Sequence, residues 1–371
     1  MMNKLWIISE LFPPDETSTS YILGEIANAC AIEYDVHVIC GPEVYDLRKK
    51  QDVEHPFQLN PAIEVIRVNG MRNDKNTIIG KLLSFFSMSR RLFRVAKKLI
   101  KDYDKVMMVT NPAPLLLFMS WLKRHRQFEL SILVHDVFPE NTVPAGLYMP
   151  SSVYNQVKQL FDKAYSRADC LIALGRDMAD VLRRKAGDGV KISVVENWAD
   201  TDTVVPVSFP EQPIKLEYAG NIGRVQGLEK LITELPNCVD LHIYGTGAME
   251  ASLKALEKPN VYFHGPYYRS QQKEVLGACH AAIVSLADGM YGLGVPSKAY
   301  NIMAAGRPIV YFGPSKGEIG LMVQENGIGY LGWPEKWDMD ELRNMGKKAR
   351  SLAESRYSKD VILAKFLDVI R

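Results

Sequence analysis

The chain has 371 residues, 47% of them hydrophobic and 24% charged, which is enough for two ordinary globular domains. Its formal net charge of +2 excludes binding to nucleic acid by bulk electrostatics. Five widely spaced cysteines without a Cys-x-x-Cys pair favour reduced core thiols in a cytoplasmic protein over metal ligation. No basic segment precedes a long apolar run, and the run from Ala113 to Leu122 is too short to span a bilayer, so we expect neither secretion nor a membrane anchor.

Apolar periodicity alternates between strand and helix along the first half of the chain, which is typical of a doubly wound α/β domain. Buried parallel strands are predicted at residues 5–8, 36–40, 63–68, 105–109, 130–134, 170–174 and 192–195. The intervening helices are predicted at 20–32, 79–101, 114–123, 153–166 and 177–185.

The loop from residue 10 to residue 20 joins the first strand to the first helix, and Ser18 to Ser20 are candidate caps for that helix. A ligand-binding loop and a purely structural turn are equally compatible with its Pro-Pro and Ser/Thr residues.

The predicted helix from Ile79 to Lys101 is strongly amphipathic. One face is apolar, and no acidic residue interrupts the stretch from Lys81 to Lys101. Such a helix can lie on an anionic bilayer, where each basic residue contributes about 1 kcal/mol. The alternative is that the apolar face packs on the sheet and the charged face is solvated. The basic sector comprises Arg90, Arg91, Arg94, Lys97, Lys98 and Lys101.

His135 and Asp136 follow a buried strand, and Glu140 lies in the same loop. Doubly wound sheets expose reactive side chains at the carboxyl ends of their strands. These three residues are therefore candidates for proton relay or for holding a hydroxyl group. Against this interpretation, a histidine at a strand end is often a hydrogen-bonded core residue.

Residues 197–210 break the pattern with Pro206 and Pro210, and we place the interdomain linker there. A second alternating set follows, with strands predicted at 216–219, 241–244, 261–263, 282–285 and 309–312 and a last helix at 359–371. The Asp200-Thr-Asp202 triplet has the spacing of a divalent-cation motif. Its position in the linker indicates a chance match, so no metal ligand is predicted.

Glycines gather where strands of the second half meet the following helix. The segment Gly220-Asn-Ile-Gly-Arg-Val-Gln-Gly227 follows one strand, and the Tyr244-Gly-Thr-Gly247 turn follows another. Neither segment matches a Walker loop or a dinucleotide fingerprint. Glycine permits close backbone approach to a ligand, and Arg224 adds a permanent charge. These loops predict a crevice at the carboxyl ends of the strands, bordered by Gly220, Gly223, Gly245 and Gly247.

A third such loop opens the segment from Gly292 to Pro308. Here Ser297 is a candidate N-cap, Lys298 lies in the first helical turn, and Asn301 follows on the same face. Backbone N–H groups and a cation suit a phosphate, and an amide suits hydroxyl groups. The alternative is an ordinary strand–loop–helix unit whose lysine and asparagine are solvated.

Together these motifs resemble the donor-binding half of glycosyltransferase family 4, in the branch that builds capsule, O-antigen and colanic-acid-type polysaccharides. Weaker matches extend over nearly the whole chain. The resemblance implies the GT-B fold, in which two doubly wound, Rossmann-like domains face a central cleft. Residues 1–203 would bind the acceptor, 204–357 the nucleotide sugar, and 358–371 would cross back to the first domain. The matching segments are 218–229, 244–247 and 296–308, with weaker ones at 7–14, 135–140 and 195–200.

The resemblance further implies a retaining, metal-independent glycosyltransferase. It would move a hexose or N-acetylhexosamine from a nucleotide diphosphate, most commonly UDP, to a polyprenyl-diphosphate-linked or oligosaccharide acceptor. The nucleotide sugar is then a substrate, and no cofactor is expected. An acceptor of this kind would bring the enzyme to the inner face of the cytoplasmic membrane.

Residue roles also follow from the resemblance. Arg224 and Lys298 would bind the diphosphate, with Asn221 and Ser297 in the same loops. Asn301 would hold the ribose, and Tyr267 lies where a base could stack. His135 would orient the sugar, and Asp136 or Glu140 would hold the acceptor hydroxyl.

The sequence departs from the family pattern at four positions. Leu293 and Asn301 replace two glutamates, and Asn221 and Gln226 replace a basic pair. Two alternatives therefore stay open. One is a nucleotide-sugar epimerase of the same fold, and the other is a non-catalytic subunit that binds the nucleotide sugar.

Overall fold

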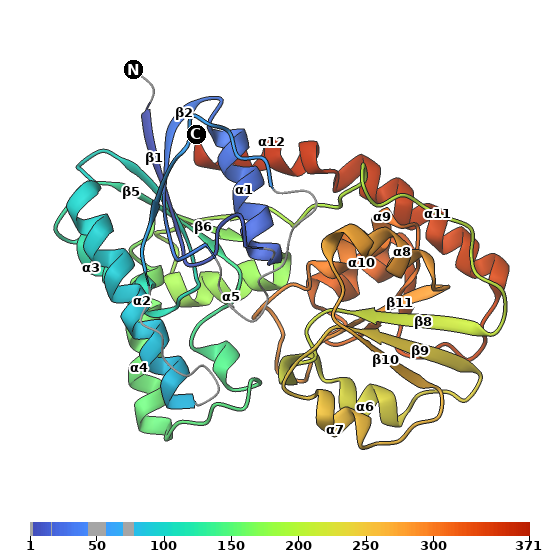
Figure 1. The fold of residues 1–371 in the computed structure, drawn as a ribbon. Coiled ribbons are helices and arrows are strands. Elements are labelled where there is room, and N and C mark those ends of the chain that lie inside the picture. The colour runs from blue at the N-terminus through green and yellow to red at the C-terminus, as the bar shows by residue number, and fades with distance from the viewer. Residues whose placement is uncertain (1–2, 16, 44–56, 70–77) are drawn as a thin grey trace.

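A computed structural model describes residues 3–15, 17–43, 57–69 and 78–371. It contains two parallel β-sheets, each packed between helices (Figure 1). The first has the order β3-β2-β1-β4-β5-β6-β7, and the second the order β10-β9-β8-β11-β12-β13. The predicted pair of doubly wound domains is therefore confirmed. The strands are β1 Asn3–Ser9, β2 Tyr34–Cys40, β3 Glu64–Arg67, β4 Lys105–Val109, β5 Glu129–Val134, β6 Cys170–Ala173, β7 Lys191–Val194, β8 Ile214–Ala219, β9 Val239–Tyr244, β10 Val261–Gly265, β11 Ala281–Ser285, β12 Ile309–Phe312 and β13 Gly329–Leu331.

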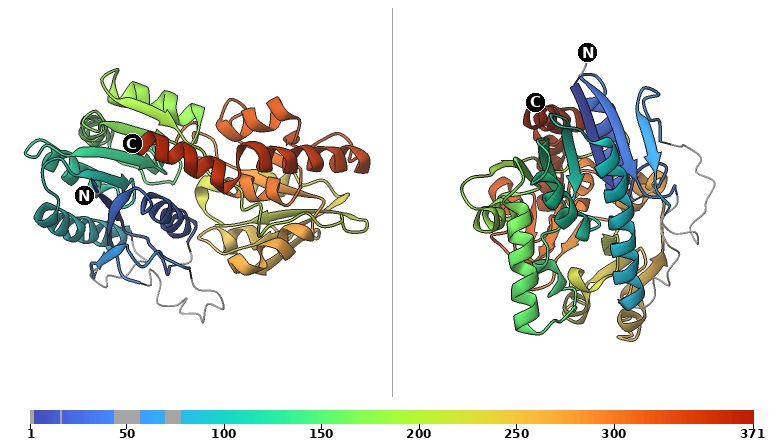
Figure 2. Two further views of the ribbon diagram at one scale, coloured as in Figure 1. Left: turned by 90° about the horizontal axis from the view of Figure 1, so that it is seen from above. Right: turned by 90° about the vertical axis from the view of Figure 1, so that its left-hand side faces the viewer.

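In the first domain α2, α3 and α4 pack side by side, while α1 lies against the last helix of the chain (Figure 2). The helices of this domain are α1 Ser18–Cys30, α2 Ile78–Leu99, α3 Pro114–Lys123, η2 Glu140–Thr142, α4 Ser151–Tyr165 and α5 Arg176–Ala186. Those that follow are η3 Arg224–Gln226, α6 Leu228–Thr233, α7 Glu250–Lys254, η4 Arg269–Gln271, α8 Gln272–Gly277, α9 Lys298–Ala304, α10 Glu318–Asn326, α11 Met339–Arg356 and α12 Lys359–Ile370.

The buried strands account for the long apolar runs of the sequence. In β6 and β11 every residue is buried, because helices cover both faces of a parallel sheet. The amphipathic α2 buries Met88, Leu92 and Ala96, which are spaced four residues apart, on one face. The strand β13 was not predicted, since three residues are too few to show periodicity.

Two predicted helix caps are wrong. The cap of α1 is Thr17, whose side chain accepts a hydrogen bond from the Ser20 N–H, one residue before the predicted Ser18 to Ser20. Ser297 precedes α9 but has helical backbone angles and makes no capping hydrogen bond. The residue before α9 does not have the extended backbone conformation from which a side chain caps the first turn of a helix.

The long α11 and the final α12 run across both domains (Figure 1). Helix α12 packs against α1, and Lys359 pairs with Glu25 of that helix at 3.4 Å. At its end, Lys105 Nζ donates to the carbonyl of Ile370 at 2.7 Å. The end of the chain is therefore attached to the first domain. The exact domain limits stay a prediction.

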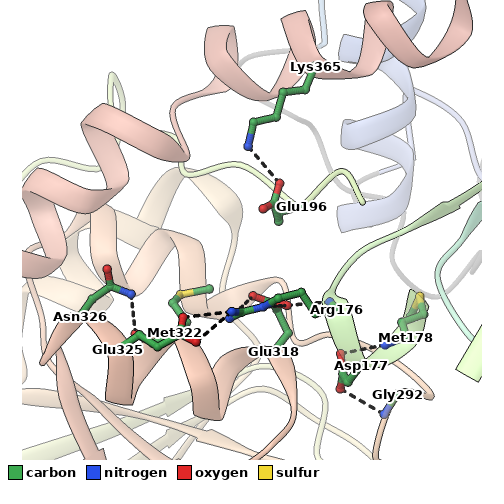
Figure 3. A network of polar contacts seen from close by, with 10 residues as sticks. All are labelled: Arg176, Asp177, Met178, Glu196, Gly292, Glu318, Met322, Glu325, Asn326 and Lys365. Carbon is green, nitrogen blue, oxygen red and sulfur yellow. Dashed lines mark hydrogen bonds and ion pairs between the residues drawn. The ribbon is translucent and has the colours of Figure 1, made fainter. Parts of the chain in front are cut away.

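A polar network also joins the domains (Figure 3). Arg176, at the start of α5, forms ion pairs with Glu318 at 3.0 Å and Glu325 at 2.9 Å on α10. Its neighbour Asp177 accepts a hydrogen bond from the Gly292 N–H at 3.1 Å. These contacts hold the carboxyl ends of the two sheets opposite each other.

Candidate functional site

A cavity of about 350 Å³ lies between the domains at the carboxyl ends of both sheets. The predicted linker, residues 197–210, which forms the hinge between the domains, and loops of both domains contribute to its wall. Eight of the predicted site residues line it, namely His135, Asp136, Gly220, Asn221, Tyr267, Ser297, Lys298 and Asn301. Glu140, Gly223, Arg224, Gly245 and Gly247 do not.

Lys298 is the most unusual of these residues. Its Nζ is buried without a hydrogen-bond partner and lies 3.6 Å from the centroid of the Tyr218 ring. Burial lowers the pKa of Lys298 to about 7, and the nearby Glu217 carboxyl opposes this shift. Gly220 has a φ of +146°, and a Cβ there would lie 2.8 Å from the ammonium. A buried ammonium group without a hydrogen-bond partner, next to a glycine that leaves room for a ligand, can bind an anion.

His135 and Asp136 form the opposite wall, at the end of β5. Their backbone N–H groups both donate to the Thr110 hydroxyl at 3.2 Å, which fixes the turn. His135 Nδ1 lies 3.4 Å from the Thr19 hydroxyl, and its Nε2 is buried without a partner. Burial lowers the pKa of His135 to about 4 and raises that of Asp136 to about 6. The imidazole is therefore neutral at pH 7.

Asp200 is the site residue that the sequence interpretation missed. It is buried and accepts hydrogen bonds from the Tyr21 hydroxyl at 2.9 Å and from the Trp198 indole at 3.2 Å. Arg269 pairs with it and stacks on the Tyr21 ring at 3.4 Å. Asp200 thus joins α1, the hinge and η4. The match at residues 195–200 already indicated this segment, but the triplet was interpreted as chance.

Asn301 is part of the same cluster. Its Oδ1 accepts from the Asp200 N–H at 2.9 Å, and its Nδ2 donates to Gln272 Oε1 at 3.0 Å. Asn301 therefore holds Asp200 in place, and its predicted role in binding the ribose stays a prediction.

The Asp200→Asn variant is expected to lose about 1–3 kcal/mol of unfolding free energy, because the charged partner of Arg269 is removed from a buried position. Denaturant unfolding would measure the loss. The matched control is Asp202→Asn, since Asp202 is exposed and should change stability by less than about 0.5 kcal/mol. Equal effects of the two substitutions would contradict this role of Asp200.

Glu140 is not available for an acceptor. Its carboxylate accepts hydrogen bonds from Lys185 Nζ at 2.6 and 2.8 Å and lies 3.6 Å from Lys158. The Lys185 side chain is only 3% exposed, and a buried ammonium requires such a partner. Glu140 is therefore part of a structural cluster between η2, α4 and α5, which corrects the prediction.

Arg224 is exposed and points out of the cavity toward Gly146 of the first domain. The cause is the 3-10 turn η3: the Gly223 N–H donates to Gln226 Oε1 at 3.0 Å, and Val225 faces the cavity in place of Arg224. Among the described residues Arg224 has no ion-pair partner. The predicted clamp of Arg224 and Lys298 is thus not assembled in this structure.

The remaining glycines bring loops together. An added Cβ at Gly245, where φ is +132°, would overlap the Gly220 carbonyl, and one at Gly247 would overlap the Ile222 carbonyl. Both glycines therefore support the loop that carries Gly220, and neither meets the cavity. Tyr267 lines the cavity, and burial raises its pKa to about 12. Within the described ranges, no three His, Cys, Asp or Glu side chains are grouped as a metal site.

Comparisons with known proteins agree with this fold. The sequence profile of glycosyltransferase family 4 matches residues 21–203, and that of glycosyl transferases group 1 matches residues 214–335. A probable glycosyltransferase, WbjE of Pseudomonas aeruginosa, is 30% identical over 404 aligned residues, covering 100% of this chain and 98% of WbjE.

Two solved structures share the fold. The sucrose-phosphate synthase of Thermosynechococcus elongatus superposes with a TM-score of 0.72 at 15% identity, covering 99% of this chain and 98% of that one. Anabaena HepE in complex with UDP-glucose gives a TM-score of 0.67 at 15% identity, covering 98% and 99%.

Proposed function

The chain belongs to glycosyltransferase family 4, and on that basis we propose that it transfers a sugar from a UDP-sugar to a lipid-linked acceptor in bacterial surface-glycan synthesis. Transfer would retain the anomeric configuration and need no metal. The UDP-glucose complex of the similar HepE supports the choice of nucleotide. WbjE, as a probable glycosyltransferase, supports the reaction class.

The unpaired Lys298 ammonium is the observation that carries the proposal. A diphosphate beside Gly220 would accept a charge-assisted hydrogen bond from it in a site with little water. As the bond from the sugar to the diphosphate breaks, negative charge grows on the leaving oxygen. A preorganised cation stabilises that charge more in the transition state than in the bound substrate.

The opposite wall would serve the acceptor and the sugar. The neutral His135 lines the cavity without the charge that would repel an oxocarbenium-like centre, and its Nε2 has no hydrogen-bond partner. The partly titratable Asp136 would accept a hydrogen bond from the attacking hydroxyl. With Glu140 engaged elsewhere, Asp136 alone takes this proposed role.

UDP binding is expected to weaken as the pH rises from 7 to 8.5. Burial lowers the pKa of Lys298 to about 7 in the free protein, so the ammonium is lost above this pH. A bound diphosphate favours the ammonium and raises its pKa, so binding takes up a proton. The apparent Kd should therefore increase up to about tenfold per pH unit, as measured by calorimetry in buffers of different ionisation enthalpy.

The Lys298→Met variant is the control, and its Kd should vary little over the same range. A flat profile for the unmodified protein would contradict the assignment of Lys298. Turnover of the UDP-sugar with and without a lipid-linked acceptor then separates transfer from epimerisation, because an epimerase would convert the donor alone.

The surface of α2 supports the proposed membrane partner. Its solvent-facing side begins with the exposed Leu83 and Phe86 and continues with a basic stripe. Trp121 of α3 lies beside this stripe, with Lys97 Nζ 5.1 Å from its ring. Apolar, aromatic and basic side chains on one face suit an anionic bilayer surface. No helix in the described ranges is both long and apolar enough to cross a membrane. The stripe consists of Arg90, Arg94, Lys97 and Lys98 of α2 and of Lys101, two residues after the end of the helix.

Reversing two charges of the stripe, with Arg90→Glu and Arg94→Glu, is expected to reduce binding to vesicles containing 30% anionic lipid by at least about tenfold. Each lost basic residue removes about 1 kcal/mol of attraction. Co-sedimentation measures the effect. The control pair is Lys347→Glu and Lys348→Glu on α11, which are equally exposed. Equal losses in both pairs would indicate a net-charge effect and contradict a docking face on α2.

A further inference from the structure

The cavity also contains a wall that the proposed chemistry does not use. It lines the same cavity as Lys298, where the diphosphate would bind, and as the pair His135 and Asp136. A sugar attached to that diphosphate would occupy the space along this wall. The inference below therefore rests on the proposed function and concerns the class of sugar.

This wall is apolar. Val225, Leu286, Met290 and Val295 all line the cavity. Backbone hydrogen bonds fix their positions: the Ala287 N–H donates to the Val225 carbonyl at 2.8 Å, and the Leu286 N–H to that of Phe312 at 2.7 Å. Ser285 also lines the cavity, but its hydroxyl already donates to the Gln226 carbonyl.

Met290 places its methyl group at the junction with the opposite wall. A Cβ added at Gly294 would lie 3.8 Å from Met290 Cε and 3.5 Å from Asp136 Oδ1. Leu293, which stands where a glutamate is usual in the family, is buried and does not line the cavity. The side chains of Val225, Leu286, Met290 and Val295 thus offer the sugar carbon and sulfur atoms.

The carboxylates near the wall do not change this character. Among the described residues that line the cavity, only Asp136 and Asp200 are acidic. The Asp200 carboxylate accepts hydrogen bonds from the side chains of four other residues, and Asp136 lies on the acceptor side. A sugar hydroxyl directed at the apolar wall would lose its water without gaining a partner.

We propose that the donor sugar is a 6-deoxyhexose, whose C6 methyl group packs against Met290 and Val295. Burying one methyl group in place of a hydroxymethyl group gains apolar contact and avoids an unpaired hydroxyl. An apolar pocket rejects an added hydroxyl only moderately, so the preference should be about 10- to 100-fold in Kd.

Matched donor pairs that differ only at C6 test this proposal. They are UDP-glucose, UDP-galactose and UDP-N-acetylglucosamine, each beside its 6-deoxy counterpart. Using all three pairs separates the effect of C6 from that of the C2 and C4 substituents. Competition calorimetry against UDP gives each Kd, and at least one 6-deoxy donor should bind about 10-fold or more tightly than its partner.

The Val295→Thr variant supplies the specific readout. It keeps the side-chain shape but replaces one methyl group of the wall with a hydroxyl, so the ratio of the two Kd values within a donor pair should shrink at least about threefold. Val153→Thr, at an exposed position of α4, is the control and should leave that ratio unchanged.

The outcomes are distinct. UDP binding with equal affinities within every pair, or a preference for the 6-hydroxy donors, overturns the inference and leaves the proposed function intact. A preference that Val295→Thr does not alter also overturns it, because the methyl group then lies elsewhere. Failure of UDP itself to bind contradicts the proposed function.

Discussion

The Lys298→Met variant is expected to lose about 10- to 100-fold in UDP affinity, which corresponds to the ~1.5–3 kcal/mol of a hydrogen bond to a charged group. It should also melt at an equal or higher temperature than the unmodified protein. A lysine whose pKa falls on folding opposes folding below its ordinary pKa of about 10.4. Because the buried Nζ of Lys298 has no hydrogen-bond partner, methionine relieves this penalty and keeps the volume.

A loss of UDP affinity without a loss of thermal stability distinguishes a binding residue from a structural one. The control is Lys215→Met, on the neighbouring strand β8, which should leave UDP affinity within about twofold because Lys215 does not line the cavity. Calorimetric titration and thermal unfolding give the two quantities. A Lys298→Met protein that is less stable and still binds UDP would show that Lys298 supports the fold instead.

His135→Ala is expected to reduce turnover by about 100-fold or more, within the range that a positioned acid–base or orienting group contributes. UDP affinity should stay within about threefold, since the imidazole lies on the wall opposite Lys298. Initial rates with a UDP-sugar and a lipid-linked acceptor measure the first quantity, and calorimetry measures the second.

The pH profile tests the protonation state of His135. Burial lowers its pKa to about 4, so the neutral imidazole persists above pH 5 and the rate should show no His135-dependent inflection between pH 5.5 and 8. The Asp136→Asn variant should instead remove an inflection near pH 6, where the carboxyl titrates. A rate inflection near pH 6.5 that His135→Ala abolishes would contradict the neutral assignment.

Local patterns of the sequence predicted most of the fold. Strands such as β4 and β12 were located to the residue, because buried parallel strands are continuous apolar runs ended by glycine or polar residues. The same patterns predicted a ligand at the carboxyl ends of the strands. Lys298 begins α9 and Gly220 follows β8, and parallel topology alone brings these two segments to one edge of the sheet.

The direction of individual side chains was less predictable. Arg224 and Val225 are neighbours, and only the 3-10 turn η3 decides which of them faces the cavity. Glu140 was placed at the site by its loop, but Lys185, 45 residues further along, engages it.

The sequence by itself thus determined the family, the two α/β units and the loops that meet at the cleft, since each depends on residues close together in the chain. Only the tertiary structure decided which polar groups are free to act. Asp200 is engaged by Arg269, Asn301 and Tyr21, which are 69, 101 and 179 residues away. Lys298 has no such partner. A side chain binds a ligand with the hydrogen-bonding capacity that its protein partners leave over, and those partners come from distant segments that folding alone brings together.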